Sequence, residues 1–179
     1  MAPAPVALCV AVLLAGCRTV SPQTARTEAA RLRASFEMHR PRYLQVIELE
    51  NSLRPETLAW LNSPAARQAH MISKTYQCQL MERWARAYFV PREIHAAMRP
   101  QEYTSLEAKT AHQRVLTHLK ERYFVLHDFQ RYAQRACEAA DRGAAPGKLS
   151  HNLQEFRQRL EARPRAVDEA SRILASLPQ

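Results

Sequence analysis

Apolar residues recur at intervals of three and four along most of this 179-residue chain, a spacing that predicts amphipathic helices. The first stripe begins after Ser21 and Pro22, which suit a helix N-cap and first turn. It continues in phase across Pro41, which predicts two helices, or one kinked helix, that bury a common face. This stripe consists of Ala25, Ala29, Leu32, Phe36, Tyr43 and Ile47.

Prolines and short polar residues divide the middle of the chain. Arg54 precedes Pro55, and the residue before a proline is disfavoured in the α conformation, so the pattern predicts a helix end there. A short helix over residues 55–61 follows, and Ser63 then caps a long helix that runs to about Phe89. The broad apolar surface of this long helix indicates a central helix with several neighbours.

The longest predicted helix lies in the second half of the chain. A less regular segment is expected between the prolines at 91 and 100. Thr104 and Glu107 then form a capping-box pair that opens a helix reaching about Asp141. Its apolar stripe consists of Leu116, Leu119, Tyr123, Leu126, Ala133 and Cys137.

A loop over residues 142–148 separates this helix from the last predicted element, which Ser150 opens. The apolar stripe of this element continues across Pro164. Such a stripe is typical of a core-facing helix, and the alternative is a C-terminal helix that detaches to bind a partner. The stripe consists of Leu149, Leu153, Phe156, Leu160, Val167, Ala170, Leu174 and Leu177.

Glycine is rare, and its rarity excludes several kinds of active site. The three glycines are Gly16, Gly143 and Gly147, and the last two lie in the predicted loop. A P-loop, a dinucleotide-binding turn and a nucleophile elbow each need glycines at defined positions, so this sequence cannot form them. Alanine, leucine, arginine, glutamine and glutamate are frequent, so we expect an all-α protein, a single helical bundle of about five to six helices.

The first residues of the chain have a different pattern. Residues 2–16 carry no charged side chain, and this run is shorter than the roughly 20 apolar residues of a bilayer-spanning helix, so it is typical of a signal peptide. The run ends in Leu14, Ala15, Gly16 and Cys17, which together resemble the lipobox of bacterial lipoproteins. An ordinary secretory signal that happens to contain a cysteine is the alternative.

The resemblance implies a modification and a location. In that family the chain is cleaved between Gly16 and Cys17, the cysteine becomes diacylglyceryl cysteine, and its new amine is usually acylated, for example with palmitate. Two or three acyl chains anchor a protein stably. Arg18 stands where an aspartate would favour the inner membrane, which implies the periplasmic face of the outer membrane. We therefore expect a signal peptide over 1–16, a lipidated tether over 17–24 and a helical domain over 25–179.

Cys78 and Cys137 are the thiols that remain if Cys9 leaves with the signal and Cys17 is lipidated. Export places them in an oxidising compartment, so we expect one interhelix disulfide between them. Closing a loop of about 60 residues stabilises the fold by roughly 4 kcal/mol in the chain-entropy account. Two separately buried free thiols are the alternative.

The net charge of +9 comes from 26 basic and 17 acidic residues, and arginine far outnumbers lysine. This preference is typical of a GC-rich genome, or it indicates attraction to an anionic leaflet, to lipopolysaccharide phosphates or to an acidic partner. Export removes the chain from nucleic acid, so we expect no nucleic-acid partner.

Candidate catalytic and metal-binding residues lack a characteristic spacing. The histidines form no H-E-x-x-H pattern, and only a site assembled from distant helices would hold a metal, so we expect neither metal nor cofactor. Glu48, Glu50 and Glu56 are candidate carboxylates for glycan cleavage, but nothing in their pattern distinguishes them from surface glutamates. We therefore expect no enzyme. The histidines are His39, His70, His95, His112, His118, His127 and His151.

Aromatic residues gather on the two long predicted helices. They belong to the core, or they form a groove or patch for a peptide, an acyl chain or a partner helix. The set consists of Tyr76, Trp84, Tyr88, Phe89, Tyr123, Phe124, Phe129 and Tyr132.

These patterns together predict an outer-membrane lipoprotein that acts as a non-catalytic binding or assembly module in an envelope complex of the secretion, pilus or motility type. The expected partners are the membrane, through acyl chains on Cys17, and an envelope protein. A cell-wall hydrolase or its activator is one alternative, and a protein that binds anionic lipid or lipopolysaccharide is another.

Overall fold

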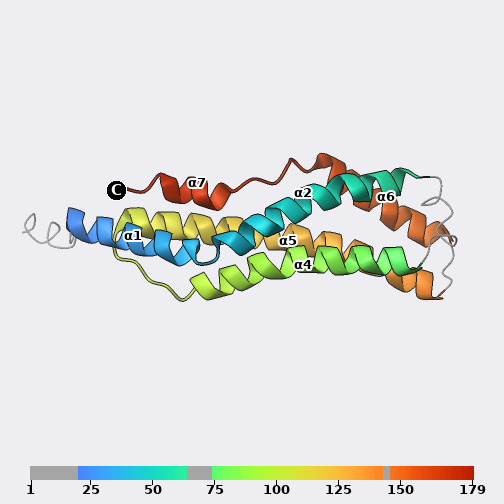
Figure 1. Cartoon of the computed structure of the whole chain (residues 1–179), viewed down its shortest axis with the longest axis horizontal. Coiled ribbons are helices and arrows are strands. Elements are labelled where there is room, and N and C mark those ends of the chain that lie inside the picture. The colour runs from blue at the N-terminus through green and yellow to red at the C-terminus, as the bar shows by residue number, and fades with distance from the viewer. Residues whose placement is uncertain (1–19, 64–73, 143–145) are drawn as a thin grey trace, which may run out of the picture.

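Helices that run along a common direction form an elongated bundle (Figure 1). The computed structural model describes residues 20–63, 74–142 and 146–179, and these residues contain no β-strand. The expected all-α bundle of five to six helices is confirmed. The described helices are α1 (Pro22–Glu37), α2 (Arg40–Asn62), α4 (Lys74–Met98), α5 (Leu106–Arg142), α6 (Pro146–Ala162) and α7 (Glu169–Ala175).

The central helix of the bundle is α5. It packs against α4 along much of its length and also contacts α1, α6 and α7, whereas α4 packs mainly on α5 and α2. The prediction that the preceding long helix is central is therefore wrong. The reason is that α5 buries residues on more than one side, among them Leu116, Leu119 and Tyr132.

Two apolar clusters fill the bundle, one in each half of its length. The first joins α1, the start of α2, the end of α4, the first half of α5 and α7, and it contains Phe36 and Tyr43. The second joins α2, α6 and the facing parts of α4 and α5 around Trp84. The Trp84 ring meets Phe129 edge-on, with the ring centroids 5.1 Å apart. Both clusters use the apolar stripes that the sequence predicts, except that Val167 of the last stripe is exposed.

The first two helices are separate. The Ser21 hydroxyl accepts a hydrogen bond from the Thr24 backbone N–H at 3.1 Å and caps α1, as expected. The chain turns at residues 38–39, and Pro41 occupies the first turn of α2. The alternative of two separate helices is therefore confirmed, and the alternative of one kinked helix is wrong.

Two helix ends expected next to prolines are wrong. α2 continues through Pro55, and α4 continues through Pro91 and includes the segment that was expected to be irregular. Leu53 and Trp60 on either side of the first proline are buried, as is Ile94 beyond the second. Burial of such side chains contributes roughly 1.5–3 kcal/mol each, enough to offset the roughly 3 kcal/mol cost of an interior proline.

The start of α5 is capped by another helix. The expected capping box of Thr104 and Glu107 is wrong, because the Thr104 hydroxyl and the backbone N–H groups of Thr104 and Ser105 donate to the Glu28 carboxylate of α1 at 2.7 to 3.1 Å. Burial raises the pKa of Glu28, but the Ser105 and Thr104 hydrogen bonds outweigh it and lower the pKa to about 2. The starts of α1 and α5 therefore lie at the same end of the bundle.

The last part of the chain contains two helices rather than one element. α6 begins at Pro146, earlier than the expected start at Ser150, and ends before Pro164 because proline cannot continue a helix. α7 begins after Asp168, whose carboxylate accepts the Ser171 backbone N–H at 3.0 Å. Residues 143–145 of the expected loop lie outside the described residues.

A disulfide joins Cys78 of α4 to Cys137 of α5, with the two Cα atoms 4.8 Å apart. The expected interhelix disulfide is therefore confirmed. Among the described helices, none is both long enough and apolar enough to cross a bilayer.

Candidate functional site: a cleft between α4 and α5

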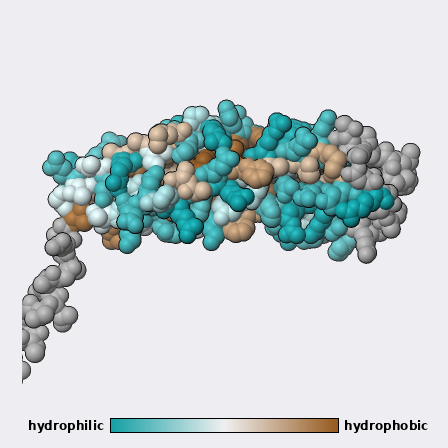
Figure 2. Space-filling view, turned by 90° about the horizontal axis from the view of Figure 1, so that it is seen from below, coloured by the Kyte–Doolittle hydropathy of each residue, from teal (hydrophilic) through white to brown (hydrophobic). Residues whose placement is uncertain are grey.

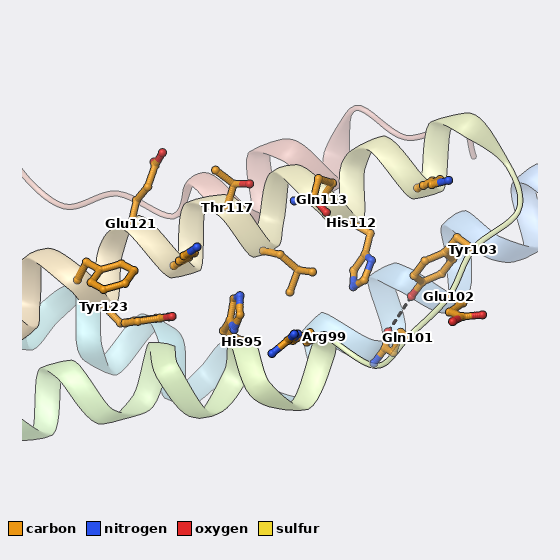
Figure 3. Close-up of a pocket in the computed structure, with 14 residues that line it drawn as sticks. His95, Arg99, Gln101, Glu102, Tyr103, His112, Gln113, Thr117, Glu121 and Tyr123 are labelled. Carbon is orange, nitrogen blue, oxygen red and sulfur yellow. Dashed lines mark hydrogen bonds between the residues drawn. The ribbon is translucent and has the colours of Figure 1, made fainter.

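The helices α4 and α5 diverge toward the segment that connects them (Figure 1), and a cleft lies between them there (Figure 3). Its volume is about 960 Å³, and its walls are the end of α4, the segment after Met98 and the first half of α5. This size lies at the upper end of the range of roughly 300–1,000 Å³ that is usual for ligand pockets. The cleft is therefore large enough to hold a ligand.

Unpaired cations line the cleft. Arg99 comes from the end of α4, whereas Lys109 and Lys120 come from α5, and all three side chains are exposed. Within the part of the chain that the structure describes, none of the three forms an ion pair. Their charges are therefore available to a ligand.

Two imidazoles point into the space between the cations. His95 of α4 and His112 of α5 both face the gap between the two helices (Figure 3). Burial, followed by the positive charges of Arg99 and Lys120 and the nearby His112, lowers the pKa of His95. Burial also lowers the pKa of His112, whose Nε2 lies 3.0 Å from the Met98 carbonyl oxygen. Both rings are therefore neutral at neutral pH. His95 is able to hydrogen-bond a ligand, whereas His112 is buried and already bonds the Met98 carbonyl oxygen.

Aromatic rings form part of the cleft wall. The Tyr123 ring lies 5.6 Å from His95 and 5.0 Å from Phe124, measured between ring centroids. Phe124 is 53% exposed, and the Lys120 ammonium lies 5.9 Å from its ring centroid. At the other end the Tyr103 hydroxyl donates to the side-chain oxygen of Gln101 at 2.7 Å. Apolar and charged contacts are thus offered side by side.

Apart from Leu116, the remaining lining residues are polar, and two of them carry a negative charge. Glu102 and Glu121 are exposed carboxylates on the rim (Figure 3). Gln101, Gln113 and Thr117 supply amide and hydroxyl groups. The whole set suits a ligand that combines separate anionic groups with apolar ones. No cluster of three or more side chains able to hold a metal occurs among the described residues.

The residues with an expected lipid role are not described. Gly16 and Cys17, where cleavage and lipidation are predicted, lie outside the described residues, as does the whole predicted signal peptide. The same is true of His70. The disulfide between Cys78 and Cys137 joins the same two helices, α4 and α5, but it lies far along them from the cleft.

The three candidate carboxylates of α2 have different surroundings. Glu48 is exposed, and Glu56 accepts two hydrogen bonds from Arg83 at 2.7 Å. Glu50 is buried and pairs with Arg122 at 2.6 Å and with Arg163 at 2.8 Å. Glu50 and Glu56 are therefore held by arginine side chains within the fold.

A second buried polar contact lies beside Glu50. The Tyr43 hydroxyl and the His118 Nε2 atom are 2.6 Å apart, and the Arg122 guanidinium lies 5.5 Å from the centroid of the Tyr43 ring. Burial raises the pKa of Tyr43 to about 12. Burial, and after it the charge of Arg122, lowers the pKa of His118. This group joins α2 to α5 in the interior of the bundle.

The aromatic set divides between the core and the surface. Trp84, Phe129 and Tyr132 are buried, as the core interpretation requires. Tyr123 and Phe124 line the cleft, as the groove interpretation requires. The core interpretation is therefore confirmed for the buried members, and a binding role for the cleft members stays a prediction.

The cleft residues of α4 were missed because the end of this helix was expected to be irregular. His95 and Arg99 are four residues apart, so in a helix they share one face. A helix that continued through Pro91 would have placed them together beside α5. That continuation depends on tertiary packing, and the local sequence argues against it.

Comparison with protein-family models, with curated proteins and with solved structures finds no match.

Proposed function

We propose that the chain is an outer-membrane lipoprotein, anchored at the periplasmic face through acyl chains on Cys17. Its helical bundle is a non-catalytic binding or assembly module in an envelope complex of the secretion, pilus or motility type. The observation that supports binding most strongly is the cleft between α4 and α5, which presents three cations without an ion pair among the described residues, the imidazole of His95 and the exposed ring of Phe124. The lipobox resemblance supports the anchor.

The geometry of the bundle supports action close to the membrane. Only four steps along the chain separate Cys17 from Ser21, the N-cap of α1, and they extend at most about 14 Å. The contacts of Glu28 hold the start of α5 at the same end of the bundle. From Leu106 to Phe124 this helix rises about 27 Å. A ligand in the cleft therefore lies within tens of ångströms of the anchor.

The anchor is tested with Cys17→Ala, with Cys9→Ala as the matched control. Cells that express each variant are grown with labelled palmitate, and their membranes are separated by density. We expect the wild-type chain and Cys9→Ala to carry the label and to fractionate with the outer membrane, and Cys17→Ala to lose both properties. Label and outer-membrane fractionation retained by Cys17→Ala would contradict the proposed anchor.

The binding role is tested by photo-crosslinking in cells. A photoreactive amino acid replaces Thr117 at the exposed wall of the cleft, and in a matched control it replaces Gln154 on the exposed side of α6. We expect a discrete crosslinked species from position 117 and none from position 154. Equal products from both positions, or none from either, would contradict binding at the cleft.

A further inference from the structure

We infer that the ligand of the cleft is a short, extended, acidic segment of a partner protein, in which separated carboxylates alternate with aromatic or aliphatic side chains. This inference rests on the proposed function and names the chemistry of its partner. Four features of the cleft support it.

The first feature is charge. Some arginines elsewhere on the surface have carboxylate partners, as in the pairs Arg42–Glu93 and Arg159–Asp128, whereas others, such as Arg131, have none among the described residues. At the cleft, Arg99, Lys109 and Lys120 lack such partners among the described residues, although they converge on one space from two helices. Carboxylates of a ligand would complete charge-assisted hydrogen bonds, which are about twice as strong as those between neutral groups.

The second feature is length. The lining residues of α5 extend from Lys109 to Phe124, which is about 22 Å at 1.5 Å per residue. An extended chain covers that distance with about seven residues. A helix of the same length and a diameter of about 10 Å occupies roughly 1,700 Å³, well above the cleft volume of about 960 Å³. An extended segment therefore fits better than a partner helix.

The third feature is the mixture of side chains. The Lys120 ammonium and the Phe124 ring are neighbours, so a carboxylate and an apolar side chain can be bound next to each other. Gln101, Gln113 and Thr117 offer donors and acceptors along the same walls. Peptide backbone groups need such partners, because a buried backbone group without a hydrogen bond is costly.

The fourth feature is the pair of carboxylates, Glu102 and Glu121, on the rim (Figure 3). A uniformly anionic surface, such as a leaflet of acidic lipid, would place negative charge against these two carboxylates as well as against the cations. A peptide with separated charges can place its carboxylates at the cations and its apolar side chains elsewhere. A second copy of the chain is disfavoured because each copy carries a net charge of +9.

The pattern of apolar surface agrees with this assignment. In the space-filling view from below, hydrophobic residues gather along the middle of the bundle, with hydrophilic residues on both sides (Figure 2). Phe89 of α4 and Phe124 of α5 are both about half exposed. Tyr88, which contacts Phe89, also approaches Tyr123 at 6.4 Å between ring centroids. Aromatic surface therefore continues from the cleft along the seam between α4 and α5.

The test uses the full mature chain, lipidated and with its disulfide intact, in nanodiscs of uncharged phosphatidylcholine. Random heptapeptides are selected against it, and the enriched peptides are synthesised in two forms. One form keeps its aspartates and glutamates, and the other replaces them with asparagine and glutamine. Fluorescence anisotropy then gives the dissociation constant of each labelled peptide.

We expect the enriched peptides to be acidic and to contain aromatic or aliphatic residues. Arg99→Gln and Lys120→Gln should each weaken binding about tenfold, as expected for loss of one charge-assisted contact. Arg131→Gln is the matched control, since it removes an exposed cation of α5 outside the cleft and should leave the constant within about twofold. All three variants change exposed side chains, so circular dichroism should show unchanged helix content.

Three results would overturn the inference. They are enriched peptides without acidic residues, amide forms that bind as tightly as the acids, and equal affinity for wild type and Arg99→Gln. A further arm of the test uses vesicles of phosphatidylglycerol. The cleft would be assigned to lipid if Arg99→Gln weakened binding to these vesicles and if acidic peptides did not displace them. A crosslink from position 117 to a partner segment without carboxylates would also overturn the acidic ligand, yet it would leave the proposed binding role intact.

Discussion

The Glu50 carboxylate holds two arginines in the interior of the bundle, and its removal should be among the most damaging single changes to the fold. Its side chain is 3% exposed, and the Arg122 side chain of α5 is 4% exposed. The guanidinium nitrogen of Arg122 lies 2.6 Å from a carboxylate oxygen of Glu50. The second partner is Arg163, which comes directly after α6 in the chain. Its side chain is 23% exposed, and its Nε atom lies 2.8 Å from the other carboxylate oxygen of Glu50. Glu50→Met removes the carboxylate with little change in volume and leaves the charge of Arg122 buried without its partner.

The expected loss follows from burial. Breaking a buried ion pair by removing one partner costs about 3–5 kcal/mol, because the remaining charge is uncompensated. Arg122→Met should cost less than Glu50→Met, since the carboxylate keeps Arg163. The double variant Glu50→Met/Arg122→Met removes both buried charges and should recover most of the lost stability, because apolar replacement of a whole pair is often neutral or stabilising.

The free energy of unfolding is measured in urea with the disulfide oxidised, by the circular dichroism of the helices. With a slope of about 2 kcal/mol per molar urea, the expected loss lowers the midpoint for Glu50→Met by about 2 M. Glu56→Met is the matched control on α2. Its carboxylate is 35% exposed, so loss of its pair with Arg83 should cost at most about 1 kcal/mol.

Two results would refute this reasoning. One is a loss for Glu50→Met no larger than that for Glu56→Met. The other is a double variant whose loss equals the sum of the two single losses, because the two groups would then not depend on each other.

Three further predictions concern the stability of the bundle. Replacing Cys78 and Cys137 together with serine should lower the free energy of unfolding by about 4 kcal/mol, and a loss under about 1 kcal/mol in urea unfolding would contradict the role of the disulfide. Because burial lowers the pKa values of His112 and His118, the unfolded chain takes up protons first as pH falls. The free energy of unfolding should therefore be highest above the ordinary histidine pKa of about 6.5 and decrease below it, with a smaller decrease in His118→Gln. A melting temperature that rises on acidification would contradict this. Glu28→Gln should destabilise the start of α5 by about 1 kcal/mol. The wild-type carboxylate stabilises the fold above the ordinary glutamate pKa, and this contribution is lost as the pH falls toward 2, so the variant should lack it. Unchanged amide hydrogen exchange at the start of α5 would exclude the cap.

Periodicity predicts the helical core because every helix buries one face with the spacing of its own turns. Leu32 and Phe36 of α1 and Leu153 and Phe156 of α6 are buried as their stripes require. The disulfide could also be predicted, because both cysteines lie on apolar stripes of long helices. The apolar stripes depend on residues close in sequence. The disulfide follows because Cys78 and Cys137 are the two cysteines that remain once Cys9 and Cys17 are assigned to the predicted signal and lipid anchor.

The remaining features depend on contacts between distant residues. Pro55 interrupts the local pattern, and only burial of its neighbours shows that α2 continues. The cap of α5 comes from Glu28, 76 residues before Thr104, so no local motif contains it. The cleft exists because α4 and α5 diverge, and nothing in either helix alone shows that Arg99 and Lys120 will line the same space.

The central claim is that an anchored bundle binds its partner through the charges of the cleft. The most direct test is the yield of the photo-crosslink from position 117 in cells, compared between Arg99→Glu and the matched control Arg131→Glu at equal protein level. We predict that Arg99→Glu abolishes most of the crosslink, that Arg131→Glu preserves it, and that mass spectrometry maps it to an acidic segment of an envelope protein. An equal yield in the two variants would contradict the account.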